Sequence, residues 1–339
     1  MDLYKKLSLI KRNTAEIIGE DQLARLIEEK KRPVVYLGTA ITGSPHIGYF
    51  VWALKLCDFL QAGFKVKILL ADVHGALDNT PWSILDKRYA YYESIIPLLF
   101  EGLGTKSKEF EFVKGSTFQL KKEYILDVMK LATEVTVHDA MKAASEVVKM
   151  GDNPKLSGLI YPLMQSLDEE YLKSDVQYGG LDQRKIFVLA GEALPKIGYE
   201  KRVHVMTPLI PGLVGKKMSS SIQGSKIDLL DPIENIKKKI QGAECEAGNP
   251  ENGIMAFLEN VIFTKKQDTQ KAFIINRPEK FGGTLSYRTY KELERDFREK
   301  KVHPLDVKNA LTEELIALLA PIEKNRAKLE KLHKAAYVN

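Results

Sequence analysis

The sequence predicts an α/β protein with a doubly wound parallel sheet, followed by a mostly helical C-terminal region. Two runs rich in β-branched residues, PVVYLGTA at 33–40 and VKILLADVHG at 66–75, have the composition of buried parallel strands. The segment between them, ITGSPHIGYFVWALKLCDFLQAGF, begins with turn-forming residues and then carries a broad apolar helical stripe. Strand, glycine-containing loop, helix and strand form a βαβ crossover, which places ligands at the carboxyl ends of the strands.

The other segments follow the same alternation until about residue 230. Residues 3–31 have apolar side chains at helical spacing and predict one or two helices, which Pro33 ends. Residues 81–150 are helical in pattern apart from a strand-like FEFVKG at 110–115, and 201–213 predict a strand leading into a loop. After about 230 the pattern becomes helical and is punctuated by prolines, with stripes at 232–241, 251–263, 289–300 and 305–320. This change predicts a domain boundary near 230.

The composition is that of a folded protein outside the membrane. A length of 339 residues predicts two packed domains, and 44% hydrophobic with 28% charged residues excludes a disordered chain. A net charge of +6 permits an anionic partner without indicating a general nucleic-acid binder. Cys57 and Cys245 form no C-x-x-C unit, so neither a disulfide framework nor a cysteine zinc site is indicated. No secretory signal or membrane-spanning run is found, so we expect a cytoplasmic location.

The loop after the first predicted strand has the features of a phosphate-binding turn. In GTAITGSPHIGY at 38–49, small residues allow close approach of the backbone, and a helix begins where a ligand would lie. The segment matches neither G-x-x-x-x-G-K-[ST] nor G-x-G-x-x-G, which disfavours a P-loop NTPase and a dinucleotide-dependent dehydrogenase. Taken alone, Gly43 and Pro45 are equally consistent with a simple turn before a helix.

A second loop, GLVGKKMSSSIQGSKIDLLD at 212–231, places Lys216 and Lys217 beside three serines. Ammonium groups supply charge and hydroxyl and backbone N–H groups supply directional donors, so this loop is suited to holding a polyphosphate. The alternative is a solvated basic loop.

A third motif, LIYPLMQSLDEEYL at 159–172, places Tyr161, Gln165 and Asp168 at positions i, i+4 and i+7. On a helix these three side chains share one face, so a phenol, an amide and a carboxylate converge on one volume. The alternatives are a polar surface stripe and a satisfied internal network.

Together, the first two loops resemble a known family. His46-Ile47-Gly48 after the first strand and Lys217-Met218-Ser219-Ser220-Ser221 after a late strand resemble the HIGH and KMSKS motifs of class I aminoacyl-tRNA synthetases, in that order. Tyr49 replaces the last His of HIGH, and Ser220 replaces the second Lys of KMSKS. Both variants resemble the archaeal and eukaryotic tyrosyl-tRNA synthetases, and this resemblance covers nearly the whole chain.

The resemblance implies a Rossmann-like catalytic domain at 1–230, with an inserted dimerisation segment at about 116–160. It implies a helical anticodon-binding domain at 231–339 and a homodimer. Such an enzyme activates L-tyrosine with ATP, whose phosphates carry Mg²⁺, and transfers tyrosine to the 3' end of tRNA(Tyr). No tightly bound metal is expected. Catalysis would rest on positioning and electrostatics, without a covalent nucleophile.

The resemblance also implies roles for individual residues. His46 and Lys217 are expected to be catalytic. ATP binding is expected at Gly38, His46, Gly48, Lys217, Met218, Ser219 and Ser220. Tyr36 and Asp168 are expected to bind the phenolic hydroxyl of tyrosine, while Tyr161, Gln165 and Gln183 hold its α-amino group. A site built to bind a hydroxyl leaves its own groups unpaired when phenylalanine enters, and this supplies the discrimination.

For tRNA, the resemblance places Lys142 and Arg184 near the first base pair of the acceptor stem. It places Phe281, His303 and Asp306 where the first anticodon base is read, and an aromatic face with a carboxylate suits a splayed base. Taken alone, His303 before Pro304 is more often structural, and Asp306 is also a possible helix N-cap.

Two rival functions remain on the sequence. Tryptophanyl-tRNA synthetase shares the fold and both ATP motifs, and the pair of Tyr36 and Asp168 argues against it. A synthetase-derived RNA-binding or signalling protein without activity is disfavoured by the intact His46, Lys217 and five-residue tyrosine pocket.

Overall fold

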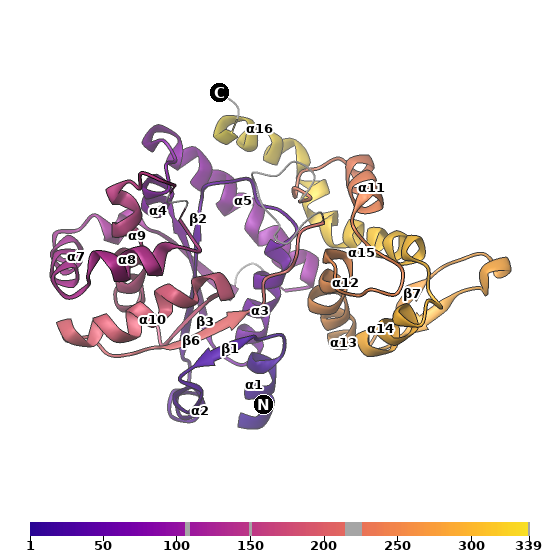
Figure 1. Ribbon diagram of the computed structural model, residues 1–339, viewed down its shortest axis with the longest axis horizontal. Coiled ribbons are helices and arrows are strands. Elements are labelled where there is room, and N and C mark those ends of the chain that lie inside the picture. Colours follow the sequence, from indigo (N-terminus) through magenta and orange to yellow (C-terminus); the bar gives the residue numbers. More distant parts are fainter. Residues whose placement is uncertain (106–108, 149–150, 214–225, 338–339) are drawn as a thin grey trace.

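The fold is a six-stranded sheet between two layers of helices, with a helical region beside one layer (Figure 1). The structure, a computed structural model, describes residues 1–105, 109–148, 151–213 and 226–337. The sheet consists of β1 (Glu16–Ile18), β2 (Val34–Ala40), β3 (Lys65–Ala71), β4 (Phe110–Lys114), β5 (Val176–Gly180) and β6 (Val203–Thr207). Among the described residues, no helix combines the length and apolar character needed to span a bilayer.

The strand order reveals where the winding of the sheet reverses. Across the sheet the order is β1-β6-β5-β2-β3-β4, and β1 is antiparallel to β6 while the other neighbours are parallel. From β2 the chain builds outward to β3 and β4, and it then returns to the opposite side of β2 with β5 and β6. A doubly wound sheet binds ligands at such a reversal, here between the carboxyl ends of β2 and β5. The predicted fold class is therefore confirmed.

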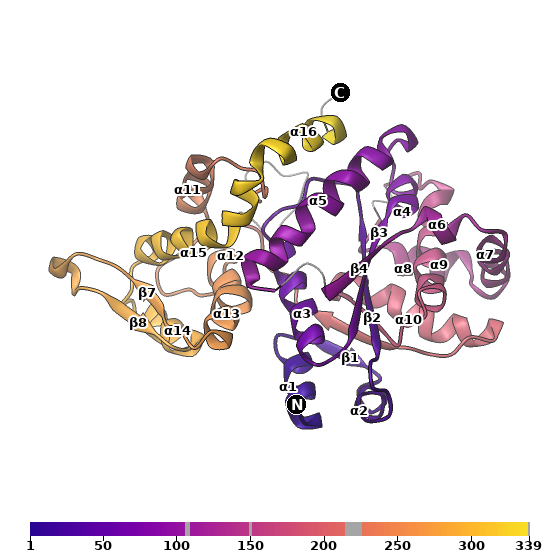
Figure 2. The ribbon, with the colours of Figure 1, turned by 180° about the vertical axis from the view of Figure 1, so that it is seen from behind.

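The two faces of the sheet bury different side chains, because successive strand residues point in opposite directions. Val35 and Leu37 of β2 enter a large core with α3 (Tyr49–Gln61) and α5 (Leu85–Leu103), while Tyr36 packs in a smaller cluster. The second face carries α8 (Val137–Ala144), α9 (Leu156–Tyr171) and α10 (Arg184–Ala193), as the two opposite views show (Figures 1 and 2). Tyr36 thus faces α9, which carries the predicted polar triad.

The remaining elements before residue 230 are short connections and outer helices. They are α1 (Leu3–Lys11), α2 (Glu20–Glu29), α4 (Asp72–Leu77), η1 (Trp82–Ile84), α6 (Ser116–Gln119), α7 (Lys122–Glu134), η3 (Leu181–Gln183) and η4 (Leu194–Ile197).

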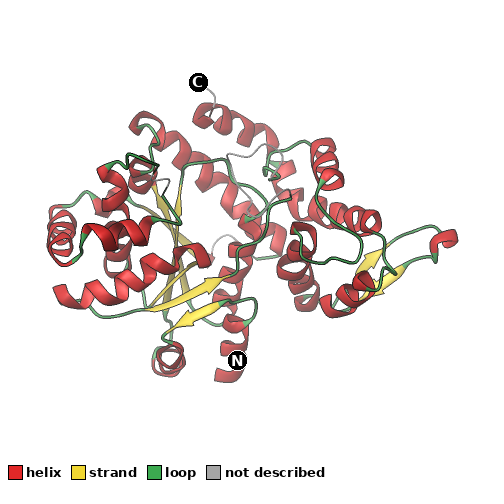
Figure 3. Ribbon diagram, in the orientation of Figure 1, coloured by secondary structure: helices red, strands yellow, loops and turns green. Residues whose placement is uncertain are grey.

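The region after 230 is mostly helical, with one small two-stranded sheet (Figure 3). Its elements are α11 (Ile233–Gly242), α12 (Gly253–Phe257), η5 (Leu258–Phe263), α13 (Thr264–Asp268), β7 (Phe273–Ile275), η6 (Glu279–Phe281), β8 (Leu285–Tyr287), α14 (Tyr290–Arg298), α15 (Pro304–Lys324) and α16 (Arg326–Tyr337). Buried side chains of α15 continue the core of α3 and α5. Gly102 of α5 lies directly against the Leu318 carbonyl of α15, and a Cβ would not fit there. The two parts therefore share one continuous core.

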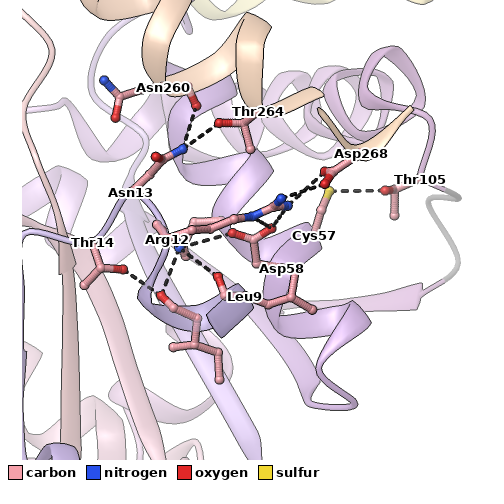
Figure 4. Close-up of polar contacts among 12 residues, drawn as sticks. Leu9, Arg12, Asn13, Thr14, Cys57, Asp58, Thr105, Asn260, Thr264 and Asp268 are labelled. Carbon is pink, nitrogen blue, oxygen red and sulfur yellow. Dashed lines mark hydrogen bonds and ion pairs between the residues drawn. The ribbon is translucent and has the colours of Figure 1, made fainter. Parts of the chain in front are cut away.

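A polar junction ties the N-terminal segment to the C-terminal region (Figure 4). Arg12 donates to Asp58 of α3 at 3.0 Å and to Asp268 of α13 at 2.6 Å. Asn13 donates to the Thr264 hydroxyl at 2.6 Å and to the Asn260 carbonyl at 3.3 Å. Asn260 lies in η5, a π-helical turn, and such turns leave backbone carbonyls free to accept other donors.

The structure corrects three sequence-based expectations. Ile17 and Ile18 are not helical but lie in β1, because Glu16–Ile18 pairs with β6 and Gly19, with φ of 85°, separates this strand from α2. The run predicted as a strand at 66–75 ends at Ala71, and Asp72–Leu77 form α4. The pattern at 251–263 is an α-helix only as far as Phe257, after which η5 follows.

Candidate active site

Two adjoining cavities lie at the carboxyl ends of β2 and β5. We call the first, of about 280 Å³, the glycine-lined cavity, since Gly38, Gly48, Gly179 and Gly180 line it. The second, of about 220 Å³, is the tyrosine-lined cavity, bordered by Tyr36 and Tyr161. Residues that line both are Gly38, Thr39, Gln165 and Gln183. The two cavities therefore form one continuous site at the reversal of the sheet.

The glycine-lined cavity lets a ligand approach the backbone closely. A Cβ at Gly179 would lie 2.9 Å from side-chain atoms of Gln183 and Phe187, so any larger residue would displace them. The opposite wall is the start of α3, where Gly48 occupies the N-cap position and His46 precedes it. The backbone N–H groups at this helix start already have acceptors within the protein, so the positive end of the helix dipole is what favours an anionic ligand here. Tyr49, where HIGH motifs have His, also lines this cavity.

His46 is held as a neutral hydrogen-bond donor. Its Nδ1 accepts the backbone N–H of Gly48 at 3.2 Å, so the ring proton is on Nε2. Burial, together with the positive charge of Lys226, lowers the pKa of His46 to about 4. At neutral pH this residue therefore offers an N–H group and no full positive charge.

The end of the second loop is paired with the first loop. His46 forms a β-bridge with Asp228, and the Ile47 N–H donates to the Ile227 carbonyl at 3.0 Å. Lys226 donates to Asp228 at 2.8 Å and to the Ser44 carbonyl at 3.3 Å. The two loops that the sequence singled out are thus adjacent at residues 226–228, near the end of the second loop. The predicted residues Lys217, Met218, Ser219 and Ser220 lie outside the described residues.

Asp168 is the central ionisable group of the tyrosine-lined cavity. It is fully buried on α9, and its Oδ1 accepts hydrogen bonds from Gln119 and Tyr124, each at 2.8 Å. Burial raises the pKa of Asp168 to about 8, against the opposing effect of these two donors. Oδ2 faces the Nε2 of His74 at 3.8 Å, beyond hydrogen-bonding distance. One carboxylate oxygen is thus saturated and the other is available to a ligand.

The other predicted tyrosine-site residues line the same cavity. The hydroxyl of Tyr36 donates to the Gln165 backbone carbonyl at 3.3 Å, and burial raises its pKa well above 10. The Gln165 amide donates to the Gln183 carbonyl oxygen at 2.9 Å. Tyr36, Tyr161, Gln165, Asp168 and Gln183, which come from β2, α9 and η3, therefore border one volume.

Sequence reasoning missed three residues of this site. His74 lines the cavity, and Gln119 and Tyr124 hold Asp168. A polar residue just after a buried parallel strand is a usable signal, and this could have identified His74. Gln119 and Tyr124 belong to helices outside the strand pattern, and their approach to Asp168 depends on tertiary packing.

The residues predicted to bind tRNA lie on the surface and line neither cavity. Lys142 at the end of α8 and Arg184 at the start of α10 are exposed, and Arg184 pairs with Glu16 at 2.6 Å. Phe281, in η6, is 60% exposed. The Nδ1 of His303 caps α15 by accepting the Leu305 N–H at 3.1 Å, so Asp306 is in the first turn and is not the N-cap.

Comparison with known proteins agrees with the fold. The sequence model of the family described as tRNA synthetases class I (W and Y) matches residues 28–320. The chain therefore belongs to the class I tRNA synthetases of the tryptophan and tyrosine group. It is 50% identical to the cytoplasmic tyrosine–tRNA ligase of Gallus gallus over 99% of this chain, and the match spans 64% of that protein. It is 41% identical to the tyrosine–tRNA ligase of Haloarcula marismortui over 99% of this chain and 98% of that one.

Structural comparison gives the same result. The crystal structure of tyrosyl-tRNA synthetase from Archaeoglobus fulgidus, complexed with L-tyrosine, matches with a TM-score of 0.89 and 38% identity, over 96% of this chain and all of that one. Within its class, the chain is a member of the tyrosyl-tRNA synthetases of the archaeal and eukaryotic type.

Proposed function

We propose that this chain is a tyrosine–tRNA ligase. In the first step the carboxylate of L-tyrosine attacks the α-phosphate of ATP, giving tyrosyl-adenylate and pyrophosphate. In the second step a ribose hydroxyl at the 3' end of tRNA(Tyr) takes the tyrosyl group and AMP leaves. One observation carries the choice of amino acid: a buried carboxylate, Asp168, has one oxygen free in a cavity that Tyr36 also lines.

The tyrosine-lined cavity suits a phenolic side chain. Asp168 Oδ2 accepts the phenolic proton, and the Tyr36 hydroxyl turns from the Gln165 carbonyl to donate to the phenolic oxygen. Indole has a single N–H donor and no acceptor, so tryptophan would offer the Tyr36 hydroxyl no acceptor. At the border with the glycine-lined cavity, Tyr161, Gln165 and Gln183 hold the α-amino group, which directs the carboxylate toward the ATP.

The glycine-lined cavity suits ATP. Gly38 and Gly48 allow its backbone contacts, and the start of α3 faces its phosphates. His46 Nε2–H donates to the transferring phosphate, Lys217 stabilises the charge of the leaving pyrophosphate, and Met218, Ser219 and Ser220 contribute to ATP binding. Among the described residues, no group of three or more His, Cys, Asp or Glu could hold a metal. Mg²⁺ would enter with the ATP phosphates, as part of the substrate.

Residues 1–230 would form the catalytic domain and 231–339 the anticodon-binding domain. Lys142 and Arg184, both exposed cations, contact the acceptor stem. Phe281 offers an exposed ring for stacking, and Asp306 accepts a hydrogen bond from a guanine edge. Arg277 donates to the carbonyls of Gly283 and Lys301, which ties the loop of Phe281 to the start of α15, beside His303.

The proposal includes a homodimer, formed by the inserted segment at about 116–160. The described residues of this segment carry large apolar side chains that are 40% to 71% exposed, namely Leu120, Ile125, Leu126, Met129, Val137, Met141 and Leu156. An apolar surface of this kind marks an interaction site. We also propose a cytoplasmic location, which the names of the relatives from Gallus gallus and Xenopus laevis support.

The test is charging of tRNA. The purified chain, incubated with ATP, Mg²⁺, labelled L-tyrosine and a tRNA(Tyr) transcript, should produce tyrosyl-tRNA that releases tyrosine on mild alkaline treatment. A tRNA with a substituted first anticodon base serves as the control and should be charged more slowly. Absence of charging with any tRNA(Tyr), from a protein that is folded by circular dichroism, would contradict the proposed function.

A further inference from the structure

His74 has a buried polar atom that the function proposed above does not use. The residue lies in α4, directly after β3, and only 2% of its surface is exposed. Its ring packs edge-on against the ring of Tyr161, with centroids 4.6 Å apart. Its Nε2 is buried and has no hydrogen-bond partner among the residues that the structure describes, and His74 is one of the residues that line the tyrosine-lined cavity. A buried polar atom without a partner is unfavourable, so a ligand group is expected there.

The hydrogen bond at the other ring nitrogen determines which nitrogen carries the proton. Nδ1 of His74 lies 3.2 Å from the amide nitrogen of Gln119. The same amide nitrogen lies 2.8 Å from Asp168 Oδ1. An NH₂ group has two protons, so Gln119 donates one to each partner, and Nδ1 of His74 is the acceptor. The proton of the neutral ring is therefore on Nε2, the atom that faces the cavity.

The orientation of Gln119 follows from the carboxylate. A flipped amide would bring its oxygen against Asp168 Oδ1, and two acceptors would repel each other. Gly115 makes room for the amide in this orientation, because a Cβ there would overlap Oε1 of Gln119. Asp168 thus fixes Gln119, and Gln119 fixes the tautomer of His74.

The distances leave room for one ligand oxygen. His74 Nε2 and Asp168 Oδ2 are 3.8 Å apart, too far for a direct hydrogen bond. An oxygen atom about 2.8 Å from each fits between them, since the two distances together exceed 3.8 Å. Such an oxygen would donate its proton to Oδ2 and accept the proton of Nε2. A phenolic hydroxyl has this combination of one donor and free lone pairs, whereas a bare ring has neither.

We propose that His74 is a specificity-determining residue whose Nε2–H donates to the phenolic oxygen of the substrate, while Gln119 is a positioning residue that fixes its tautomer. The inference rests on the proposed function and adds a third group to the recognition of the hydroxyl by Tyr36 and Asp168. Burial lowers the pKa of His74 to about 4, so the ring is neutral at working pH. The Tyr161 carbonyl opposes this effect but makes no hydrogen bond to Nε2.

The first test replaces the ring by one of similar shape without the donor. In tyrosine-dependent pyrophosphate exchange, His74→Phe should lower kcat/KM for tyrosine about 2- to 10-fold, the usual range for one neutral hydrogen bond. The inhibition constant of phenylalanine should stay the same, because phenylalanine has no oxygen to accept the bond. His74→Gln, which restores an N–H donor near the position of Nε2, should recover tyrosine use. Equal weakening for tyrosine and phenylalanine would show a structural role and overturn the inference.

His204→Phe is the matched control. His204 is also buried and faces a carboxylate of α9, since its Nε2 lies 3.0 Å from Glu169, but it lines neither cavity. This variant should change thermal stability and leave the preference for tyrosine over phenylalanine intact. If the preference for tyrosine over phenylalanine falls as much in His204→Phe as in His74→Phe, the cause would be a general disturbance of the packing of α9. The inference would then fail.

A second measurement does not depend on the folding of a variant. In ¹⁵N-histidine-labelled wild-type protein, the nitrogen shifts of His74 should identify a neutral ring with its proton on Nε2. L-tyrosine should shift the Nε2–H proton downfield, and phenylalanine should not. A proton on Nδ1, or the same shift with both ligands, would refute the inference. If the wild type shows no tyrosine-dependent pyrophosphate exchange at all, the proposed function fails. That outcome is distinct from the results above, which refute only the role of His74.

Discussion

Replacing Asp168 by asparagine should reduce the preference for tyrosine more than any other single change in the tyrosine-lined cavity. The two side chains have the same shape. The asparagine oxygen would take the place of Oδ1, where Gln119 and Tyr124 both donate at 2.8 Å. The amide nitrogen would then replace Oδ2 and present a donor to the cavity, so the phenolic proton would lose its acceptor.

The magnitude follows from the bond that is lost. A hydrogen bond to a charged group contributes about 1.5 to 3 kcal/mol. At about 1.36 kcal/mol for each factor of ten, the ratio of kcat/KM for tyrosine to that for phenylalanine should fall about 10- to 150-fold. The assay is pyrophosphate exchange with each amino acid. The melting temperature at pH 7 should not fall, because asparagine does not titrate and so removes the cost of keeping this carboxyl protonated in the fold while the unfolded chain is ionised. An unchanged ratio in a folded variant would refute the role of Asp168.

The same residue predicts a pH dependence. Burial raises the pKa of Asp168 to about 8, and the phenolic proton is accepted by the carboxylate form. The affinity of the free enzyme for tyrosine should therefore rise as pH increases from 6 toward about 8, and Asp168→Asn should remove this rise.

The same pKa affects stability. The folded state binds this proton more tightly than the unfolded state, so Asp168 lowers the free energy of unfolding as pH rises from about 4 to about 8. Isothermal titration calorimetry and thermal unfolding across this range measure both effects, and a flat binding profile in the wild type would contradict the assignment.

The other predictions concern separate parts of the chain. Tyr36→Phe should lower the preference for tyrosine over phenylalanine about 2- to 10-fold in pyrophosphate exchange, and no change would place the recognition of the hydroxyl elsewhere. Lys217→Ala should slow adenylate formation about 10²- to 10³-fold in stopped flow with little effect on tyrosine binding, and an unchanged rate would remove it from the mechanism. Phe281→Ala and Asp306→Ala should each weaken tRNA charging but not exchange, and a parallel loss of both activities would indicate a structural role. Met129→Asp should shift the protein toward monomer in analytical ultracentrifugation without unfolding it, and an intact dimer would exclude this surface.

The sequence predicted those parts of the fold in which a periodic pattern of apolar residues marks the side of a strand or helix that is buried. The βαβ unit around His46 was readable because its strands are buried on both faces and its helix carries an apolar stripe. β1 was not readable, because Ile17 and Ile18 continue the helical spacing of their neighbours, and only pairing with β6 makes them a strand. The two-stranded sheet of β7 and β8 has three residues in each strand, too few to give a clear period.

The part of the site that lies on one face of a single helix was predictable from the sequence. Tyr161, Gln165 and Asp168 share a face of α9 by their spacing alone, and the structure places all three on the tyrosine-lined cavity. His74 and Gln119 come from separate short helices, α4 and α6. Their contact with Asp168 depends on how these helices pack, which no local pattern encodes.

The central claim is that this enzyme selects tyrosine, and the amino acid dependence of ATP–pyrophosphate exchange tests it most directly. Each of the twenty amino acids would be supplied in turn to the wild-type protein with ATP, Mg²⁺ and labelled pyrophosphate. We predict exchange with tyrosine far above that with phenylalanine, and none with tryptophan. Exchange supported by tryptophan, or by no amino acid, would contradict the claim.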